Sequence, residues 1–467
     1  MRIGFGTPWG SDPTAGFTAL ISFLTEEAWL GTTPDGRQTD RTAIGWNWDA
    51  SHTTLRLVLR PNIYFHDSLP LDGDIAARIL RQSIEDGGGL SGPDVTSVEK
   101  TGQYTIDIHL SKPDAFLLSD LTLATIVKPG KDPESTGPFE VVSQSKQEAV
   151  LRAFPRYYQG RPALNEIDLK TYPTQRNAWA ALMRGDIDML HEVSREATQF
   201  VEAESTVSSY SFARPYYIPL VFNVRHPVLK NPEVRKALNE AVDRVALVHD
   251  GLNGWGRPAD GPIPPEHWAY AHGTPFEFNP DDARVRLDAA GYRLKPAAPN
   301  AIPHRFTFNC LVYTGDSRFE RLAVILQKQL ADVGVDMNLV AVKDTREFMT
   351  RIRNGNFDAF LFEMAGRSLS WVYEFWHSGD GPLNTGYHSA DKALDRLKES
   401  RSDDEIRAAI AELARIMHDD PPAAFLAWQT TVRAVSTKFD VEPVKDRDIF
   451  SNVWQWRLAP PNQQAGR

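Results

Sequence analysis

The sequence predicts an α/β protein that is divided into two or three domain-sized units. The chain has 467 residues, and a single hydrophobic core stops growing at about 250 to 300 residues. Short segments with an apolar residue at every second position alternate with segments in which apolar residues repeat about every 3.6 positions. The amphipathic stretch 318–333 ends at Gly334 and leads directly into the apolar stretch 335–342, as a helix that returns to a sheet does.

Residues 2–6 are strand-like, and two further strands are predicted from alternation. Leu55, Leu57 and Leu59 alternate with other residues over 55–60, and residues 104–110 repeat the same two-residue period. Both segments are therefore expected to be half-buried antiparallel strands. The single cysteine, Cys310, lies in the alternating stretch 306–310, which predicts a buried strand residue rather than a reactive thiol.

Two helix starts share one pattern, in which Asn is the N-cap and Pro occupies the first helical position. Asn231-Pro232 precedes apolar residues that continue to Val245, and Asn279-Pro280 precedes a second apolar stripe. Gly251 and Gly291 are the expected C-terminal stops. The first of these helices is therefore predicted to continue beyond residue 245.

Composition excludes several classes of protein. The formal net charge of −10 and a pI near 5.7 argue against a surface for nucleic acid or for anionic membranes. No run of about 18 apolar residues occurs that would span a membrane. Met1 leads directly into strand-like residues, so either the protein is cytoplasmic or Met1 stands where a secretory signal was removed.

The sequence contains none of the strong catalytic or metal motifs. A nucleophile elbow, a His-Glu-x-x-His pair, a P-loop and a cysteine pair are all missing, so neither enzyme, metal site nor cofactor is predicted. Asp186 and Asp188 are close enough in sequence to act as paired carboxylates. The favoured interpretation is structural, with a helix over 178–184 that stops at Gly185 before a short strand.

An aromatic cluster offers a better functional signal. Trp371, Tyr373, Phe375 and Trp376 follow the strand-like stretch 358–362 and alternate with polar residues. Flat rings with a few polar groups suit a ligand site, because the rings supply buried area and the polar atoms fix orientation. An amphipathic helix that packs its rings into the core is the alternative.

Four ordered segments resemble the family 5 extracellular solute-binding proteins, which include dipeptide, oligopeptide and nickel binders of ABC importers. The segments are 48–75, with Leu59-Arg60-Pro61 and Phe65-His66-Asp67; 135–188, with Thr136-Gly137-Pro138-Phe139 and Gly160-Arg161-Pro162; 220–265, with Asn231-Pro232 and Asp243-Arg244; and 278–391, with Ala290-Gly291-Tyr292 and Asn384-Thr385-Gly386-Tyr387. Each segment alone is a weak signal. The ordered set, which covers nearly the whole chain, is specific.

The resemblance implies a two-lobed, periplasmic-binding-protein-like fold of type II in its large form, with lobes joined by a hinge. Lobe one would comprise 1–225 and 430–467, including an extra β-rich subdomain at roughly 45–160, and lobe two would be the inserted 226–429. The chain would bind a small polar solute between the lobes and deliver it to an ABC transporter permease. It would be a monomer, periplasmic or extracellular, with a lipid anchor left open, and would bind no nucleic acid.

Position within the resemblance gives the candidate ligand contacts, which are Trp9, Phe222, Asn223, Met364, Arg367, Trp371, Trp376, Asn384, Tyr387, Trp428 and Gln429. Peptide binders of the family usually carry an aspartate after this lobe-two strand to pair with the peptide's amino terminus. Residues 363–370 contain none. Glu363 is a candidate substitute, whereas Arg367 opposes an ammonium and favours a carboxylate or a hydroxyl-rich ligand. Peptide and oligosaccharide ligands therefore stay equally open, and nickel ranks behind them.

Two other classes of function remain as alternatives. A cytoplasmic sensor with the same fold would ordinarily carry a basic helix-turn-helix segment, and the acidic chain shows none. A hydrolase would need a nucleophile or paired carboxylates, for which only Asp186, Asp188 and Glu363 are candidates.

Overall fold

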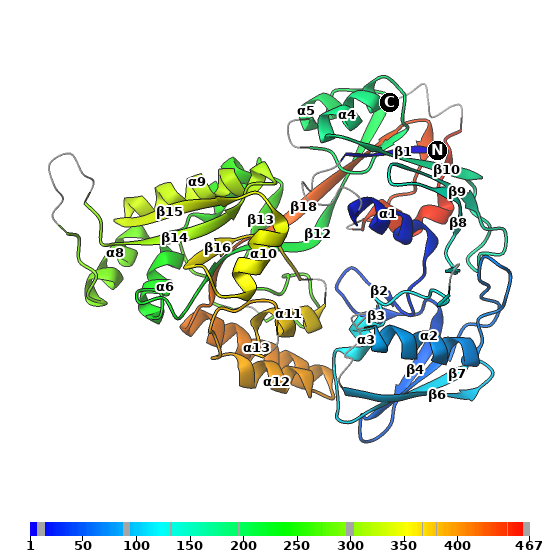
Figure 1. Ribbon diagram of the computed structural model, residues 1–467, viewed down its shortest axis with the longest axis horizontal. Coiled ribbons are helices and arrows are strands. Elements are labelled where there is room, and N and C mark those ends of the chain that lie inside the picture. The colour runs from blue at the N-terminus through cyan, green and yellow to red at the C-terminus, as the bar shows by residue number, and fades with distance from the viewer. Residues whose placement is uncertain are drawn as a thin grey trace. The chain divides into compact units, whose positions relative to one another are not determined.

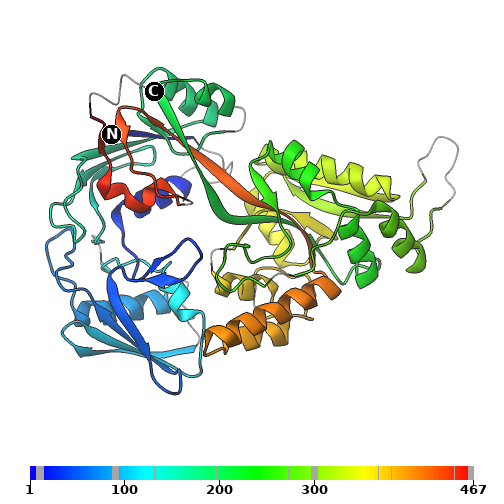
Figure 2. The same ribbon diagram turned by 180° about the vertical axis from the view of Figure 1, so that it is seen from behind.

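The computed structural model describes residues 1–6, 15–86, 94–130, 133–194, 197–271, 273–295, 303–366, 368–379, 381–445 and 447–460. The chain forms two compact units (Figures 1 and 2). Unit 1 comprises Met1–Ala213 and Thr431–Arg467, and unit 2 comprises Arg214–Thr430. The boundaries expected from the sequence are 225/226 and 429/430. In the structure the chain passes from one unit to the other within two long strands, β12 (Val207–Phe222) and β18 (Ala423–Ser436).

The main sheet of unit 1 is built around the first strand of the chain. β1 (Arg2–Gly6) pairs in parallel with β10 (Glu166–Tyr172) and β11 (Met189–Leu190). β9 (Glu148–Ala153) and β8 (Phe139–Gln144) extend the sheet with antiparallel pairing. The other elements of this part of unit 1 are α1 (Ala15–Thr25), α4 (Gln175–Met183), α5 (Thr198–Glu202), β19 (Phe439–Asp440), the 3-10 helix η3 (Ile449–Gln455) and β20 (Arg457–Leu458).

Unit 1 also contains a second, smaller sheet with a hydrophobic core of its own. Its strands follow the order β4 (Ala43–Trp48), β5 (Thr54–Leu59), β7 (Thr105–Leu110) and β6 (Val95–Gly102), and α2 (Gly73–Glu85) packs on it. Leu55, Leu57 and Leu59 are buried and the intervening Arg56 is exposed, so the predicted half-buried strand is confirmed. The neighbouring short elements are β2 (Gly31–Thr32), β3 (Gln38–Thr39) and α3 (Leu117–Asp120).

The sheet of unit 2 has a parallel group at its edge. β14 (Phe306–Tyr313) lies between β15 (Val335–Val342) and β16 (Ala359–Leu361), and all three run parallel. β12 pairs antiparallel with β16, while β17 (Met364–Ala365) and β13 (Gly256–Pro258) add to β12 and β18. The helices are α6 (Pro232–Glu240), α7 (Arg244–Ala246), the π-helix η2 (Leu247–Gly251), α8 (Pro280–Ala289), α9 (Ser317–Asp332), α10 (Thr345–Arg353), α11 (Leu369–Trp376), α12 (Asp391–Lys398) and α13 (Asp403–Asp419).

Most local predictions in unit 2 are confirmed. Asn231 and Asn279 cap their helices by accepting hydrogen bonds from Glu233 N and Asp282 N. Gly291 follows α8 with a φ of +91°, where a side chain would be strained. Cys310 is fully buried in β14.

The prediction of one continuous helix from Pro232 past Val245 is wrong. α6 ends at Glu240, and Asp243 begins a new helix by accepting a hydrogen bond from Ala246 N at 2.9 Å. Arg244 then donates to the oxygens of Asn239 and Val242 at the end of α6. A second N-cap thus competes with helix continuation, which hydrophobic periodicity alone does not reveal.

Candidate functional site

Parallel strands indicate where a binding site belongs in each unit. Ligands of open α/β sheets bind beyond the carboxyl ends of the parallel strands, where the following loops converge. In unit 1 this edge is marked by Gly6 at the end of β1. In unit 2 it is marked by Tyr313, Val342 and Leu361, which end β14, β15 and β16.

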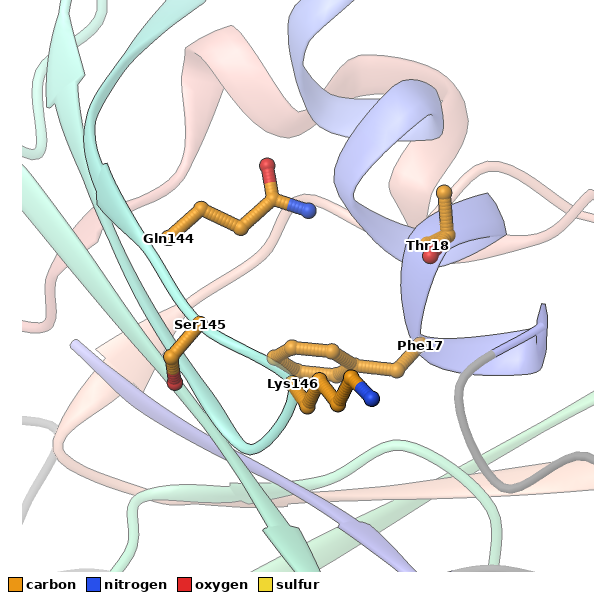
Figure 3. Close-up of a pocket in the computed structure, with 5 residues that line it drawn as sticks. All are labelled: Phe17, Thr18, Gln144, Ser145 and Lys146. Atoms are coloured by element: carbon orange, nitrogen blue, oxygen red, sulfur yellow. The ribbon is translucent and has the colours of Figure 1, made fainter.

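Unit 1 has an open hollow of about 530 Å³ at this edge, between α1 and the turn that joins β8 to β9 (Figure 3). The turn lies on the carboxyl side because Glu148, at the start of β9, pairs with Lys170, close to the end of β10. Ser145 shapes the turn by accepting hydrogen bonds from the backbone N–H groups of Gln147 and Glu148.

The hollow combines an aromatic floor with polar groups. Phe17 and Thr18 project from α1, and Gln144, Ser145 and Lys146 approach from the turn (Figure 3). Phe17 is nearly fully buried, whereas the three turn residues are exposed. Within the described part of the chain, the Gln144 amide and the Lys146 ammonium have no hydrogen-bond or ion-pair partner. Both groups are therefore available to a polar solute.

The carboxyl edge of unit 2 carries a buried polar network instead of a hollow. Glu363 follows β16, and only 4% of its side chain is exposed. Its Oε2 accepts a hydrogen bond from Gln429 Nε2 at 2.9 Å and lies 3.5 Å from the guanidinium groups of both Arg214 and Arg318.

Arg318 connects this glutamate to the start of α9. Its Nη1 donates to Gln429 Oε1 at 2.5 Å, and its Nε donates to Asp316 Oδ2 at 2.7 Å. Asp316 is also the N-cap of α9, since it accepts from Arg318 N. We call Arg214, Asp316, Arg318, Glu363 and Gln429 the polar network. It contains two cations and two anions, so it is neutral, as buried charges must be to avoid a large desolvation cost.

A buried aromatic cluster, formed by Tyr217, Trp376 and Trp428, lies beside the polar network and shares only Trp376 with the aromatic stretch singled out in the sequence. Trp428 is 2% exposed, its ring centroid lies 5.0 Å from that of Tyr217, and Trp376 Nε1 donates to the Tyr217 hydroxyl at 3.0 Å. Burial raises the pKa of the Tyr217 hydroxyl above its usual value, so it stays protonated. A Cβ at Gly366 would lie 2.8 Å from Trp428 Cζ3, so only glycine allows the chain to pass this ring.

A narrow slot adjoins the cluster. It lies between the proline-rich segment 262–267 and the start of α11, and its lining is Pro262, Ile263, Pro264, His267, Gly366, Ser368, Leu369 and Val372. Gly366 N donates to Pro215 O at 2.9 Å, which fixes this wall of the slot against β12.

The structure brings together some of the residues predicted as ligand contacts. Trp376 and Trp428 belong to the aromatic cluster, and Gln429 belongs to the polar network. Met364 pairs with Tyr217 on β12. Trp371 is half-buried on α11, with its ring 6.5 Å from that of Phe375. Trp9 and Arg367 lie outside the described residues.

Four other predicted contacts gather at the opposite, amino-terminal end of β16. Asn223 Nδ2 donates to Phe357 O at 2.8 Å, and its Oδ1 accepts from Arg225 N. Asn384 Oδ1 accepts from Arg225 Nη1 at 2.7 Å. Phe222 and Tyr387 are buried. These contacts are internal, and a role in ligand binding stays a prediction for all four.

Neither the hollow nor the arginines of the polar network are among the features predicted from the sequence. The segment Asp316-Ser317-Arg318 carried a usable signal, because it joins a predicted strand to a predicted helix at a carboxyl end. Nothing in the sequence marks Arg214, Gln144 or Lys146, which only long-range packing places at these edges.

The acids considered for catalysis are engaged in ion pairs. Asp188 accepts hydrogen bonds from Arg2 N at 2.8 Å and from Arg2 Nη2 at 2.7 Å, and Asp186 pairs with Arg184. Gly185 ends α4 with a φ of +74° before β11, so the structural interpretation holds. Among the residues that the structure describes, no group of three or more His, Cys, Asp and Glu side chains is arranged to hold a metal ion, and no helix is long and apolar enough to cross a membrane.

Comparison with known proteins decides the family. Residues 39–386 match the profile of the bacterial extracellular solute-binding proteins, family 5, middle region. The chain belongs to this family. The predicted family and the two-lobed fold class are thereby confirmed, together with the general role of a solute-binding protein for ABC importers.

Individual relatives of this family 5 protein share little sequence identity with it, but the similarity extends over most of both chains. It is 24% identical to the oligopeptide-binding protein AppA of Bacillus subtilis, over 86% of this chain and 80% of the relative. It is 22% identical to the glutathione-binding protein GsiB of Pectobacterium atrosepticum, over 95% and 90%.

Solved structures show the same fold. NikA from Brucella suis in complex with Fe(III)-EDTA superimposes with a TM-score of 0.86 at 17% identity, over 98% of this chain and 100% of that one. AppA from Bacillus subtilis in complex with a nonapeptide gives a TM-score of 0.77 at 22% identity, over 98% and 99%.

Proposed function

We propose that this family 5 protein captures a small polar solute, a peptide derivative or an oligosaccharide, and delivers it unchanged to the permease of an ABC importer. The observation that carries the proposal is that unit 1 has an open hollow with exposed polar groups at the carboxyl ends of its parallel strands, while only β12 and β18 carry the chain between the units. Two units with two covalent connections suit a binding protein that opens and closes on its ligand.

The expected mechanism is a shift of conformational population. A solute that binds the closed form more tightly than the open form increases the closed population by its differential affinity. The permease then recognises the closed form, and no covalent bond of the solute changes. We place the protein outside the cytoplasm, as a monomer that acts without nucleic acid, a metal or a cofactor.

The class of solute is supported from two directions. The relatives named for oligopeptide and glutathione binding favour a peptide derivative. The half-buried ring of Trp371 in unit 2 and the polar rim of the hollow in unit 1 suit either a peptide or a sugar, because both present flat faces and hydrogen-bonding groups. We therefore place peptide derivatives first and oligosaccharides second.

A thermal-shift screen tests the proposal. The purified protein is heated with di- and tripeptides, N-acetylated peptides, oligosaccharides, amino acids and divalent metals, and each hit is recovered and weighed by mass spectrometry. A ligand at 100 times its dissociation constant adds about 2.7 kcal/mol to the free energy of unfolding. We expect a stabilising hit that is recovered intact. A hit that is consumed would indicate a hydrolase, and no hit in any class would indicate a role other than solute capture.

A further inference from the structure

The carboxyl edge of unit 2 contains three acidic side chains that follow parallel strands, and all three are engaged. Asp344 caps α10 by accepting a hydrogen bond from Glu347 N at 2.7 Å. Asp316 caps α9 and pairs with Arg318. Glu363 accepts from Gln429 and faces two guanidinium groups. Asp316 and Glu363 are largely buried among these partners and are not free to bind a cation carried by a solute, whereas Asp344 is exposed and uses one carboxylate oxygen for its cap.

Glu363 is the acid that the sequence singled out as a receptor for an ammonium group. Its surroundings oppose that role, because an arriving ammonium would compete with Arg214 and Arg318 for the same oxygen. The polar network is neutral before a solute arrives. A further positive charge would leave it with a net charge in a largely buried position, which carries a high desolvation cost.

The sequence beyond Glu363 adds no compensating acid. Residues 364–373 contain Arg367 and no Asp or Glu. The next acid, Glu374, is exposed on α11, and in the described part of the chain its carboxylate has no hydrogen-bond or ion-pair partner. Glu374 is therefore both the rival receptor for an ammonium and a matched control for Glu363.

We propose that Glu363 is the internal counter-charge of Arg214 and Arg318, and that the solute consequently offers no free ammonium group to unit 2. The solute class is then a neutral or acidic polar compound, such as a peptide derivative with a blocked amino group. This inference rests on the proposed function for the identity of the site, whereas the role assigned to Glu363 is independent of it.

The role of Glu363 is tested on the unliganded protein by thermal unfolding. Glu363→Gln keeps the shape of the side chain and removes the charge, so it leaves two guanidinium groups without their shared counter-charge. We expect the Tm to fall by about 5 °C or more, while Glu374→Gln leaves it unchanged. A carboxylate held ready for a ligand behaves in the opposite way, since its removal leaves stability unchanged or raised. An unchanged or raised Tm for Glu363→Gln therefore overturns the proposal.

A double variant separates charge balance from space filling. Arg214→Gln combined with Glu363→Gln removes one cation and one anion together. We expect the double variant to recover part of the Tm lost by Glu363→Gln, even if the single variant folds poorly. Additive losses from the two substitutions would contradict a counter-charge role.

The solute class is tested with a matched pair of probes, Ala-Ala-Ala and its N-acetyl derivative, by calorimetric titration of the native protein. We expect the acetylated probe to bind at least as tightly as the free peptide. A preference of about 100-fold for the free amine overturns the proposal, and its loss in Glu374→Gln or in Asp344→Asn would identify the receptor. If neither probe binds, the peptide class is wrong. If no solute of the wider screen binds either, the proposed function fails, while the Tm measurements still decide the role of Glu363.

Discussion

The two carboxyl-edge regions differ in how their polar groups are used. In unit 1 the groups that surround the hollow are exposed, and Gln144 and Lys146 have no partner in the described part of the chain. In unit 2 the groups of the polar network are largely buried, and each makes an internal hydrogen bond or ion pair. Exposed polar groups are solvated by water and can exchange it for a solute, whereas buried ones must be satisfied by the protein itself. Unit 1 is thus suited to offer hydrogen bonds, and unit 2 to present a rigid surface.

The largest expected effect on stability comes from replacing a cationic side chain by Met in each of the two regions. Arg318→Met removes the guanidinium that joins Asp316, Glu363 and Gln429, and takes one counter-charge from each of two largely buried carboxylates. We expect a loss of about 3–5 kcal/mol in the free energy of unfolding, measured by urea denaturation. The control is Lys146→Met in unit 1, which changes a similar cationic side chain and is expected to stay within about 0.5 kcal/mol. Equal effects would remove the distinction between the two regions.

A second comparison tests the packing of the aromatic cluster. Gly366→Ala would place a Cβ 2.8 Å from Trp428 Cζ3 and 3.2 Å from Pro262 O, so the ring or the chain must shift. We expect a loss of about 1–3 kcal/mol in the free energy of unfolding and a changed tryptophan fluorescence spectrum. Gly261→Ala is the control, because no heavy atom lies within 4 Å of its new Cβ. If Gly366→Ala changes neither the free energy of unfolding nor the fluorescence spectrum, this part of unit 2 is not rigid.

The pH dependence of stability extends the comparison to a paired acid of unit 1. Burial alone would raise the pKa of Asp188, but the side-chain and backbone N–H donors of Arg2 outweigh burial and hold the pKa below its usual value. The stabilisation is therefore present above the unfolded-state pKa of about 3.9 and is lost as the pH falls through the lower folded-state value. We expect Asp188→Asn to lower Tm at pH 7 and to flatten its fall below about pH 4, whereas the exposed Asp186→Asn changes neither. If the Tm of Asp188→Asn falls below pH 4 as steeply as that of the unchanged protein, this assignment is wrong.

The smallest expected effect on stability comes from the hollow itself. Gln144→Ala and Lys146→Met remove exposed groups, so the free energy of unfolding should change by about 0.5 kcal/mol or less. Solute binding should weaken by about tenfold for Lys146→Met, since a hydrogen bond from a charged group contributes roughly 1.5–3 kcal/mol. Calorimetric titration with a solute found in the screen measures this. Unchanged affinity in both variants would show that the hollow does not contact the solute.

The sequence by itself determined the local elements and the family. The alternation of Leu55, Leu57 and Leu59, the Asn-Pro helix starts and Gly291 each act over a few residues, so a linear pattern reports them directly. The ordered motifs likewise identified the family, because they survive as short stretches of sequence. The sequence also singled out Trp376 and Trp428, whose role in ligand binding stays a prediction.

Only the tertiary structure decided which polar groups bind one another inside the protein and which stay accessible to a solute. Glu363 and Gln429 are 66 residues apart and Arg318 and Gln429 are 111 apart, and no local pattern links them. The same holds for the hollow, where a turn and a helix far apart in sequence meet at one sheet edge. The physical reason is that burial and charge pairing depend on distances in space, which the fold sets and sequence spacing does not.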